Sequence, residues 1–236
     1  MDDSGATGAS SGIDYERLYR YRHRNVKQGA RQAVWREIAP FVYRLLGSPK
    51  RTLDPGAGRC EFISAIPGEE RWAADSIEHP EARADPNLKV VVGDIRDLEF
   101  PRAYFDGIFV SNLLEHLGTQ DEVADFLKKM RNSTESGGRI AVLGPNFRYC
   151  ADRYFDYADH TLALTHVAID EHLHAAGYEV LRVIPRFLPY SFSGALPPSA
   201  LLTRAYLRFP LAWRVLGKQY LVLGSAVSDV DREHGQ

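Results

Sequence analysis

The fold of this chain is decided by the stretch RTLDPGAG at residues 51–58. A short strand is expected to end at Asp54, and a turn that contains Gly56 and Gly58 follows it. Glycine adopts positive φ angles and lets the backbone come close to a ligand. A helix expected over 61–66 would present unpaired N–H groups at its start. The stretch therefore predicts a strand, a turn and a helix, with a small-molecule site at the turn.

The segments around this unit alternate between strand and helix patterns. Strands are expected at 51–54, 72–75, 89–94, 105–110, 139–143, 178–184 and 220–223. The third of these is apolar on both faces, as buried parallel strands are. Such alternation predicts right-handed crossovers and an α/β fold, with a mostly parallel sheet and helices on both faces. Ligands then bind beyond the carboxyl ends of the strands.

The helical patterns frame this sheet. Residues 15–47 predict helix in two pieces, and Pro40 should kink or break it. Further helices are expected at 121–131, 165–176 and 201–216, with turns, ends or breaks at Gly137, Gly177 and Pro210. Residues 145–160 are expected to be irregular, and 187–198 to form a loop.

One domain is predicted over residues 13–227. Its parts would be a helical segment at 13–47, a half with the glycine turn and its ligand site at 48–144, and a second half with small cap insertions at 145–227. The segment 1–12, rich in Gly, Ser and Ala, and the polar tail 228–236 are expected to be disordered.

The composition excludes several classes of protein. The 236 residues carry a net charge of −2, so no global field draws the chain to nucleic acid or to an anionic membrane. No apolar run reaches the length of about eighteen residues that spans a bilayer, and no secretory leader is recognisable at residue 1. Cys60 and Cys150 lack the spacing of a metal site. We expect a cytoplasmic protein that binds no nucleic acid and does not insert stably into membranes; its oligomeric state is left open.

The charge of Asp54 indicates which ligand the glycine turn takes. A dinucleotide site would have a third glycine at position 61, where this chain has Glu61. The Asp54 carboxylate would repel a pyrophosphate and attract a ligand that carries an ammonium group. Both observations disfavour a nucleotide-dependent oxidoreductase, which is kept as a competing hypothesis.

Asp54-Pro55-Gly56-Ala57-Gly58 resembles the first motif of the class I S-adenosylmethionine-dependent methyltransferases, with Cys60 in place of the third motif glycine. The resemblance implies a Rossmann-like seven-stranded sheet, an N-terminal helical lid and S-adenosylmethionine as cofactor. It further implies that Asp75 binds the ribose, with Glu78 as a second candidate, and that Asp94, followed by Ile95, contacts the adenine. The fourth motif ends at Ser111 and Asn112, which would line the cofactor, and His116 lies in a Glu-His turn common in small-molecule members.

The acceptor side is predicted from an unusual run of acids, aromatics and histidines at 154–166. We expect Asp159, His160 and His166 to line the acceptor pocket, with one of His160, His166 and His116 as general base, because a histidine held by an aspartate can accept a proton. Some relatives bind a divalent metal through an E-x-x-E-H turn. Asn112 replaces the first carboxylate here, so no metal is expected.

The acceptor is expected to be a small molecule, a hydroxyl of a sugar or glycan, because several segments resemble methyltransferases from bacterial polysaccharide gene clusters. Alternatives are N- or C-methylation of another natural product or of a quinone-like metabolite, and a scaffold that binds without turnover. The run Arg17, Arg20, Arg22, Arg24 and Lys27 would be a solvated helix face rather than an RNA site. The apolar and Arg-rich helix 201–216 allows peripheral membrane contact, although a packed cap helix is the simpler interpretation.

Overall fold

A computed structural model describes residues 14–22, 24, 28–83, 85–190 and 199–227. The predicted disorder of 1–12 and 228–236, and most of the predicted loop at 187–198, lie outside these residues. Among the described residues, no helix is long and apolar enough to cross a membrane.

A seven-stranded sheet forms the centre of the molecule, in the order β3-β2-β1-β4-β5-β7-β6. Its strands are β1 Arg51–Pro55, β2 Glu70–Asp75, β3 Leu88–Val92, β4 Phe105–Ser111, β5 Thr134–Pro145, β6 Tyr178–Leu188 and β7 Gln219–Ala226. The strands β1 to β5 pair in parallel, and β7 runs antiparallel to both β5 and β6. The predicted mostly parallel sheet is confirmed. Because the chain moves outward from β1 in both directions, the carboxyl ends of β1 and β4 form the crevice in which such sheets bind ligands.

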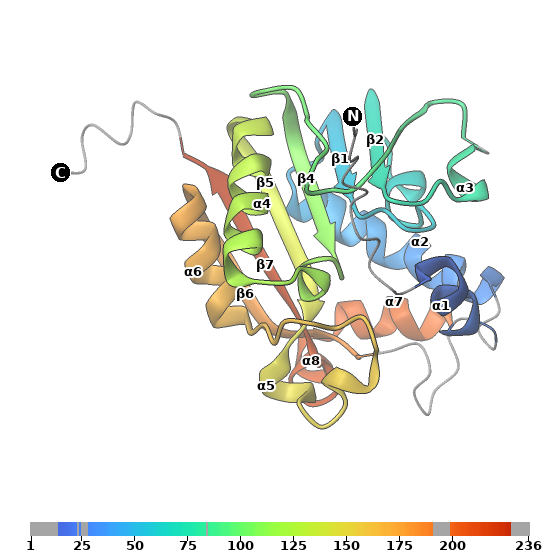
Figure 1. Ribbon diagram of the computed structural model, residues 1–236. Coiled ribbons are helices and arrows are strands. Elements are labelled where there is room, and N and C mark those ends of the chain that lie inside the picture. Colours follow the sequence, from blue (N-terminus) through green and yellow to red (C-terminus); the bar gives the residue numbers. More distant parts are fainter. Residues whose placement is uncertain (1–13, 23, 25–27, 84, 191–198, 228–236) are drawn as a thin grey trace, which may run out of the picture.

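Helices cover both faces of the sheet (Figure 1). One face is covered by α4 Gln120–Ser133 and α6 His166–Ala176, and the other by α2 Gln28–Leu45 and α7 Ala200–Arg208. Side chains alternate along β4, so that Ile108 and Val110 pack toward the first pair of helices and Phe109 toward the second. The shorter elements are α1 Tyr15–Arg22, η1 Ile63–Ala65, α3 Pro80–Arg83, η2 Leu114–His116, α5 Phe147–Cys150, η3 Tyr154–Asp156 and α8 Pro210–Leu216.

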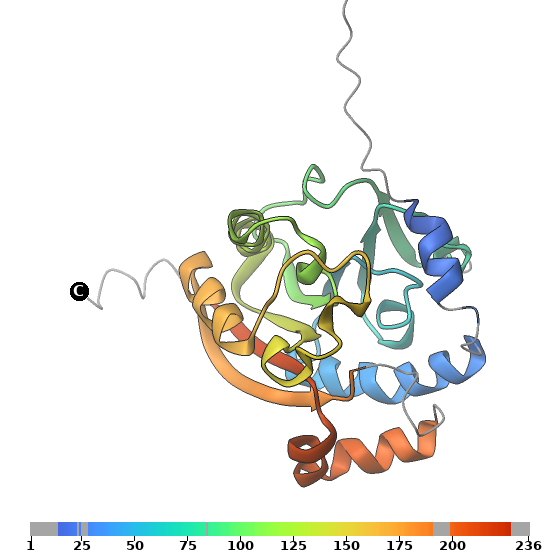
Figure 2. The same ribbon diagram turned by 60° about the horizontal axis from the view of Figure 1, so that its bottom comes forward.

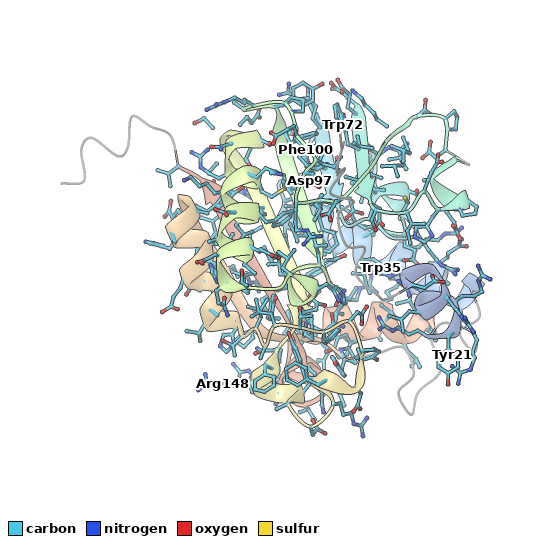
Figure 3. The ribbon with its side chains drawn as sticks, in the orientation of Figure 1. Tyr21, Trp35, Trp72, Asp97, Phe100 and Arg148 are labelled. Carbon is cyan, nitrogen blue, oxygen red and sulfur yellow. The ribbon has the colours of Figure 1, made fainter. Side chains whose placement is uncertain are left out.

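Aromatic side chains close the core at the end of the sheet away from this crevice. Trp72 and Phe100, both labelled in Figure 3, pack edge-on against Phe105, with ring centroids at 5.3 and 6.4 Å. Edge-to-face pairs of this kind add to the stabilisation by buried area. Polar residues lie at the opposite end of the sheet, at the carboxyl ends of the strands.

The predicted break at Pro40 was wrong. The helix α2, which begins at Gln28, runs without interruption through Pro40 to Leu45. Ile38 and Val42, on either side of the proline, are buried against the sheet. Tertiary packing of this face outweighs the backbone hydrogen bond that proline cannot donate.

Four other local predictions also need correction. The helix expected at 61–66 is a single 3-10 turn. The strand β3 is not buried on both faces, because it lies at the sheet edge and leaves Val92 52% exposed. Gly137 does not lie in a turn before β5, because this strand already begins at Thr134 and contains Gly137, at φ +77°. The segment 145–160 contains α5 and η3. The αL cap at Gly177 and the break before Pro210 are confirmed.

Candidate active site

The glycine turn after β1 has the backbone conformation that its sequence predicts. Gly56 and Gly58 have φ angles of +75° and +51°, and Cys60 is also left-handed at +58°. The N–H groups of Gly56 and Ala57 donate to the carbonyl of Ala74 on β2, at 2.7 and 3.1 Å. The position of the third motif glycine thus keeps a glycine-like conformation although it carries a buried Cys side chain.

Three carboxylates surround this turn. Asp54 is 2% exposed, and its Oδ1 has no hydrogen-bond partner within the described part of the chain. Burial and the neighbouring carboxylates of Asp75 and Glu61 raise the pKa of Asp54 well above its usual range. Glu61 pairs with Arg31 of α2, whereas Asp75 accepts from the Gly58 N–H at 2.7 Å.

This donor set fits a ligand that carries positive charge. A cation at the turn would meet the unpartnered oxygen of Asp54 and relieve the repulsion among the carboxylates. A phosphate would add to that repulsion. A Cβ at Gly58 would meet no atom within 4 Å, so the space beside this glycine is open for a ligand.

The other predicted cofactor residues follow the neighbouring strands. Asp94 comes after β3 and is held by the backbone N–H and the guanidinium of Arg96, which lower its pKa. Ile95 is buried in the core beneath it. Ser111 ends β4, and Asn112 has a φ angle of +48° and donates its N–H to the Leu143 carbonyl. These residues lie along the same edge of the sheet as Asp54.

The acceptor-side histidines meet at the turn after β4. Nδ1 of His116 lies 2.9 Å from the carbonyl oxygen of Asp159 and 3.5 Å from its carboxylate. The ring of His160 packs edge-on against that of His116 at 5.1 Å. Glu115, which is 2% exposed, places a carboxylate within 4.8 Å of both histidines. The structure therefore brings together His116, Asp159 and His160, three of the predicted catalytic residues.

Arg22 is a site residue that the sequence did not reveal. Its guanidinium makes a two-point ion pair with the fully buried Asp159 carboxylate and lies over the ring of Tyr157 at 4.7 Å. This pair lowers the pKa of Asp159 against the raising effect of burial. The helix α1 is thereby joined to residues 154–160, which we call the acceptor loop. The two residues are 137 positions apart, and Arg22 lies in a run of arginines that gives no local sign of this role.

His166 is held by different partners. Its Nδ1 lies 2.9 Å from the side-chain nitrogen of Asn146, and its ring stacks on that of Tyr149. The same Asn146 nitrogen donates to the carbonyl of Pro185. His166 thus takes part in a separate polar contact at the start of α6.

The comparisons with known proteins agree with this geometry. Residues 53–142 match a family model described as a methyltransferase domain. That segment begins in the β1 strand and includes the glycine turn, Asp75, Asp94 and the Glu-His turn. Within these residues the chain matches a methyltransferase domain, and its fold is that of solved S-adenosylmethionine-dependent methyltransferases. The fold therefore agrees with the resemblance seen in the sequence.

Solved structures share this fold at low sequence identity. A methyltransferase from Archaeoglobus fulgidus is 16% identical with a TM-score of 0.63, over 90% of this chain and all of that one. A putative methyltransferase from Haloferax volcanii, solved in complex with the Trm112 methyltransferase activator, is also 16% identical with a TM-score of 0.63, over 93% of this chain and all of that one. A 1,6-didemethyltoxoflavin-N1-methyltransferase from Burkholderia thailandensis, with bound S-adenosylhomocysteine, is 19% identical with a TM-score of 0.55, over 94% of this chain and 93% of that one. Among curated proteins no relative matches the sequence.

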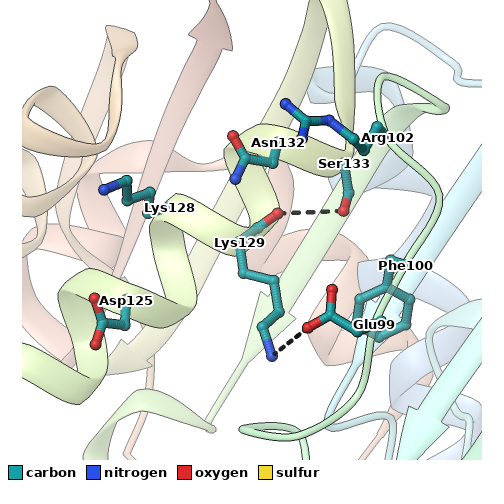
Figure 4. A pocket seen from close by; sticks show the side chains of 8 residues that line it. All are labelled: Glu99, Phe100, Arg102, Asp125, Lys128, Lys129, Asn132 and Ser133. Carbon is teal, nitrogen blue, oxygen red and sulfur yellow. Dashed lines mark hydrogen bonds and ion pairs between the residues drawn. The ribbon is translucent and has the colours of Figure 1, made fainter.

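A pocket lies away from this edge of the sheet. It is formed by the carboxyl-terminal half of α4 and the segment that precedes β4 (Figure 4). Lys129 and Glu99 face each other across it at 3.9 Å. Because β4 begins at this end, the pocket lies opposite the carboxyl ends of the strands and adds no residue to the site.

Proposed function

We propose that this methyltransferase transfers a methyl group to a hydroxyl of a small-molecule acceptor, a sugar or a glycan, with His116 as general base. S-adenosylmethionine, when bound, supplies the methyl group on a sulfonium. Asp54, Asp75, Asp94 and the glycine turn would hold it. The observation that carries the proposal is the contact between His116 and Asp159 beside the carboxyl end of β4.

The tautomer of His116 follows from its partner. A carbonyl oxygen can only accept a hydrogen bond, so Nδ1, 2.9 Å from the Asp159 carbonyl, carries the proton. In the neutral ring Nε2 is then free to take a proton from an acceptor hydroxyl. The Asp159 carboxylate, 3.5 Å from Nδ1, would stabilise the imidazolium that forms.

His160 suits binding of the acceptor better than proton transfer. Burial, assisted by the nearby His116, lowers its pKa to about 4, so it is neutral and only weakly basic near pH 7. Its Nδ1 is buried and has no hydrogen-bond partner in the described structure. That nitrogen can accept or donate one hydrogen bond to an acceptor hydroxyl. The ring stacks on Tyr157 and meets Tyr154 edge-on.

The sugar acceptor is supported by these side chains and by the resemblance to polysaccharide-cluster enzymes. Flat aromatic rings beside polar groups suit a polyhydroxylated ring. N-methylation remains the alternative, and one structural neighbour is named as an N1-methyltransferase. A neutral amine needs no base before it attacks, so the two chemistries differ in their need for His116. We also propose a cytoplasmic protein that binds no nucleic acid.

The cluster of Glu115, His116 and His160 has the composition of a metal site. We nevertheless propose that turnover needs no metal. Burial raises the pKa of Glu115, which favours the neutral acid, and the Arg22 guanidinium already neutralises Asp159. A divalent cation would therefore enter without a free negative charge to balance it. We expect chelation to leave turnover unchanged.

The test is turnover of a panel of sugar acceptors by single variants. His116→Gln should lower kcat roughly 10²–10⁴-fold, the range for loss of a general base, while S-adenosylhomocysteine still binds. His174→Gln, an exposed residue of α6, is the matched control. Undiminished O-methylation by His116→Gln would remove this base. An equal loss in His166→Gln alone would transfer the role to His166, and binding without turnover of any acceptor would favour the scaffold.

A further inference from the structure

The helices α7 and α8 carry an exposed apolar surface. Eleven large apolar side chains among the described residues are exposed, and six of them lie within 201–216. These six are Leu201 at 74%, Leu202 at 48%, Phe209 at 58%, Leu211 at 59%, Val215 at 71% and Leu216 at 51%. Figure 2 shows α7 and α8 as the outermost layer of the molecule, outside α2. We call these six residues the α7–α8 face.

The orientation of this face is fixed by contacts on the opposite side of the helices. Leu207 and Trp213 are buried against the rest of the protein. The Tyr206 hydroxyl donates to the Phe187 carbonyl at 2.7 Å, and Arg204 forms a two-point pair with Glu37 of α2. The helices are therefore held in place while their large apolar side chains point to solvent. A packed cap helix explains the inner side of α7 and α8 but not the outer one.

The segment that carries the face is basic, and Glu37 of α2 pairs with one of its arginines, Arg204. Residues 180–227 contain six basic side chains and no acidic one, in a chain whose net charge is −2. The basic residues are Arg182, Arg186, Arg204, Arg208, Arg214 and Lys218. Arg208 and Arg214 are exposed and alternate along the helices with the apolar side chains. Apolar side chains beside cations are typical of helices that lie in the interface of an anionic bilayer.

The face is joined to the acceptor side of the active site. The carbonyl of Lys218, just after α8, accepts a hydrogen bond from the N–H of Asn146, which begins the stretch 146–160 that ends in the acceptor loop. Tyr190 extends from the end of β6 to donate toward the carbonyls of Arg153 and Tyr154. Figure 1 places α8 at the same end of the strands as the acceptor loop.

We propose that the α7–α8 face binds an anionic lipid bilayer, and that the acceptor hydroxyl belongs to a membrane-anchored glycan. The apolar side chains would enter the interface while Arg208 and Arg214 meet lipid phosphates. A second copy of the chain is a poorer occupant, because paired faces would bring these arginines together. The identity of the acceptor rests on the proposed function, whereas the bilayer contact does not.

The test is co-flotation of the full chain with vesicles. Wild-type protein should bind vesicles of phosphatidylcholine with about one third phosphatidylglycerol, and bind pure phosphatidylcholine far less. Leu211→Gln combined with Val215→Gln should weaken binding roughly tenfold or more. Arg208→Gln combined with Arg214→Gln should weaken it by a similar factor and reduce its dependence on salt. The control is Val167→Gln, which replaces a residue that is 45% exposed on α6.

The outcomes separate the bilayer from other occupants. The replaced residues are exposed, so folding should persist; unchanged S-adenosylhomocysteine affinity checks this. Failure of the wild-type chain to float, or equal flotation of the face variants, would overturn the proposal. A wild-type chain that is dimeric in solution, with face variants that are monomeric, would also overturn the proposal. If the face variants no longer float but methylate a soluble sugar acceptor as fast as the wild-type chain, the results support the bilayer contact and the proposed function independently.

Discussion

The burial of Asp54 opposes the stability of the free protein, while its proposed role is to bind the cofactor. Its carboxyl group is buried beside two other carboxylates, and its pKa is raised, so ionisation costs stability as the pH rises above the usual value. Asp54→Asn removes that cost. We expect the free protein near pH 7 to gain about 1–3 kcal/mol in unfolding free energy, while its affinity for S-adenosylhomocysteine falls roughly 10–100-fold.

Thermal unfolding and calorimetric titration measure the two effects on the same sample. Asp125→Asn, at an exposed position of α4, is the matched control and should change neither. A less stable Asp54→Asn protein would mean that the carboxylate is satisfied in the free state. Binding of NAD in place of S-adenosylhomocysteine would overturn the assignment of the whole turn.

The two glycines of the turn separate backbone strain from steric overlap. Both have positive φ, so an alanine at either position costs about 1 kcal/mol of strain. A Cβ on Gly56 would also lie 3.0 Å from Leu113 Cδ1, whereas one on Gly58 meets nothing within 4 Å. We therefore expect Gly56→Ala to destabilise the protein by about 1 kcal/mol more than Gly58→Ala. Equal unfolding free energies in denaturant titration would show that Leu113 yields without cost.

The sequence predicts the local structure at single residues well where that structure depends on neighbours in the chain. Asp54, Gly56 and Gly58 were placed because a strand end and a glycine turn are local patterns. Nothing local distinguishes Arg22 from the other arginines of its run, because its partner, Asp159, is 137 residues away. Contacts of that range depend on the assembled fold.

The acceptor loop is the element whose stability should depend on pH. The pKa of His160 is lowered to about 4 from 6.5, so the folded loop binds this proton less well than the unfolded chain. The contribution of neutral His160 to the unfolding free energy is complete above pH 6.5 and is lost as the pH falls toward 4. The pKa of Asp159 is lowered from its usual value of 3.8, so protonation of this carboxylate removes further stability below that pH. Asp54, with a raised pKa, acts in the opposite direction.

A variant isolates this effect from the other groups. His160→Gln should flatten the fall in unfolding free energy between pH 6.5 and 4 by about 1–3 kcal/mol, since His160 is only partly exposed. Denaturant titrations of both proteins at several pH values in this range measure the difference. Parallel curves for the two proteins would show that His160 accepts a proton in the fold.

Elements were predicted where the pattern and the packing agree. The strands β1, β2, β4 and β5 and the helices α4 and α6 follow their periodicity, and Gly177 ends α6 as expected. The errors arise where tertiary context decides. Buried neighbours carry α2 through Pro40, and an edge position exposes a face of β3 that its apolar sequence did not predict.

At the scale of the whole molecule, the candidate site is assembled from residues that lie far apart in the sequence. The helix α1 reaches the acceptor loop only through tertiary contacts, and Arg22 supplies the ion pair that joins them. Without Arg22 the buried Asp159 carboxylate would keep His116 as its charge partner within the described part of the chain. The contact between α1 and the acceptor loop, which the proposed lid role of α1 requires, thus has a physical cause in this protein that can be tested.

Arg22→Gln should therefore release α1 from the loop. We expect kcat/KM to fall about 10–100-fold, and amide protons of 15–22 to exchange faster, because loss of a charge-assisted pair leaves a buried carboxylate unpaired. Arg22→Lys should recover part of the loss, since lysine keeps the charge but not the two-point geometry. Arg17→Gln, at an exposed position on the same helix, is the control. If exchange in α1 is unchanged while turnover falls, Arg22 acts on Asp159 alone and α1 is held by its other contacts.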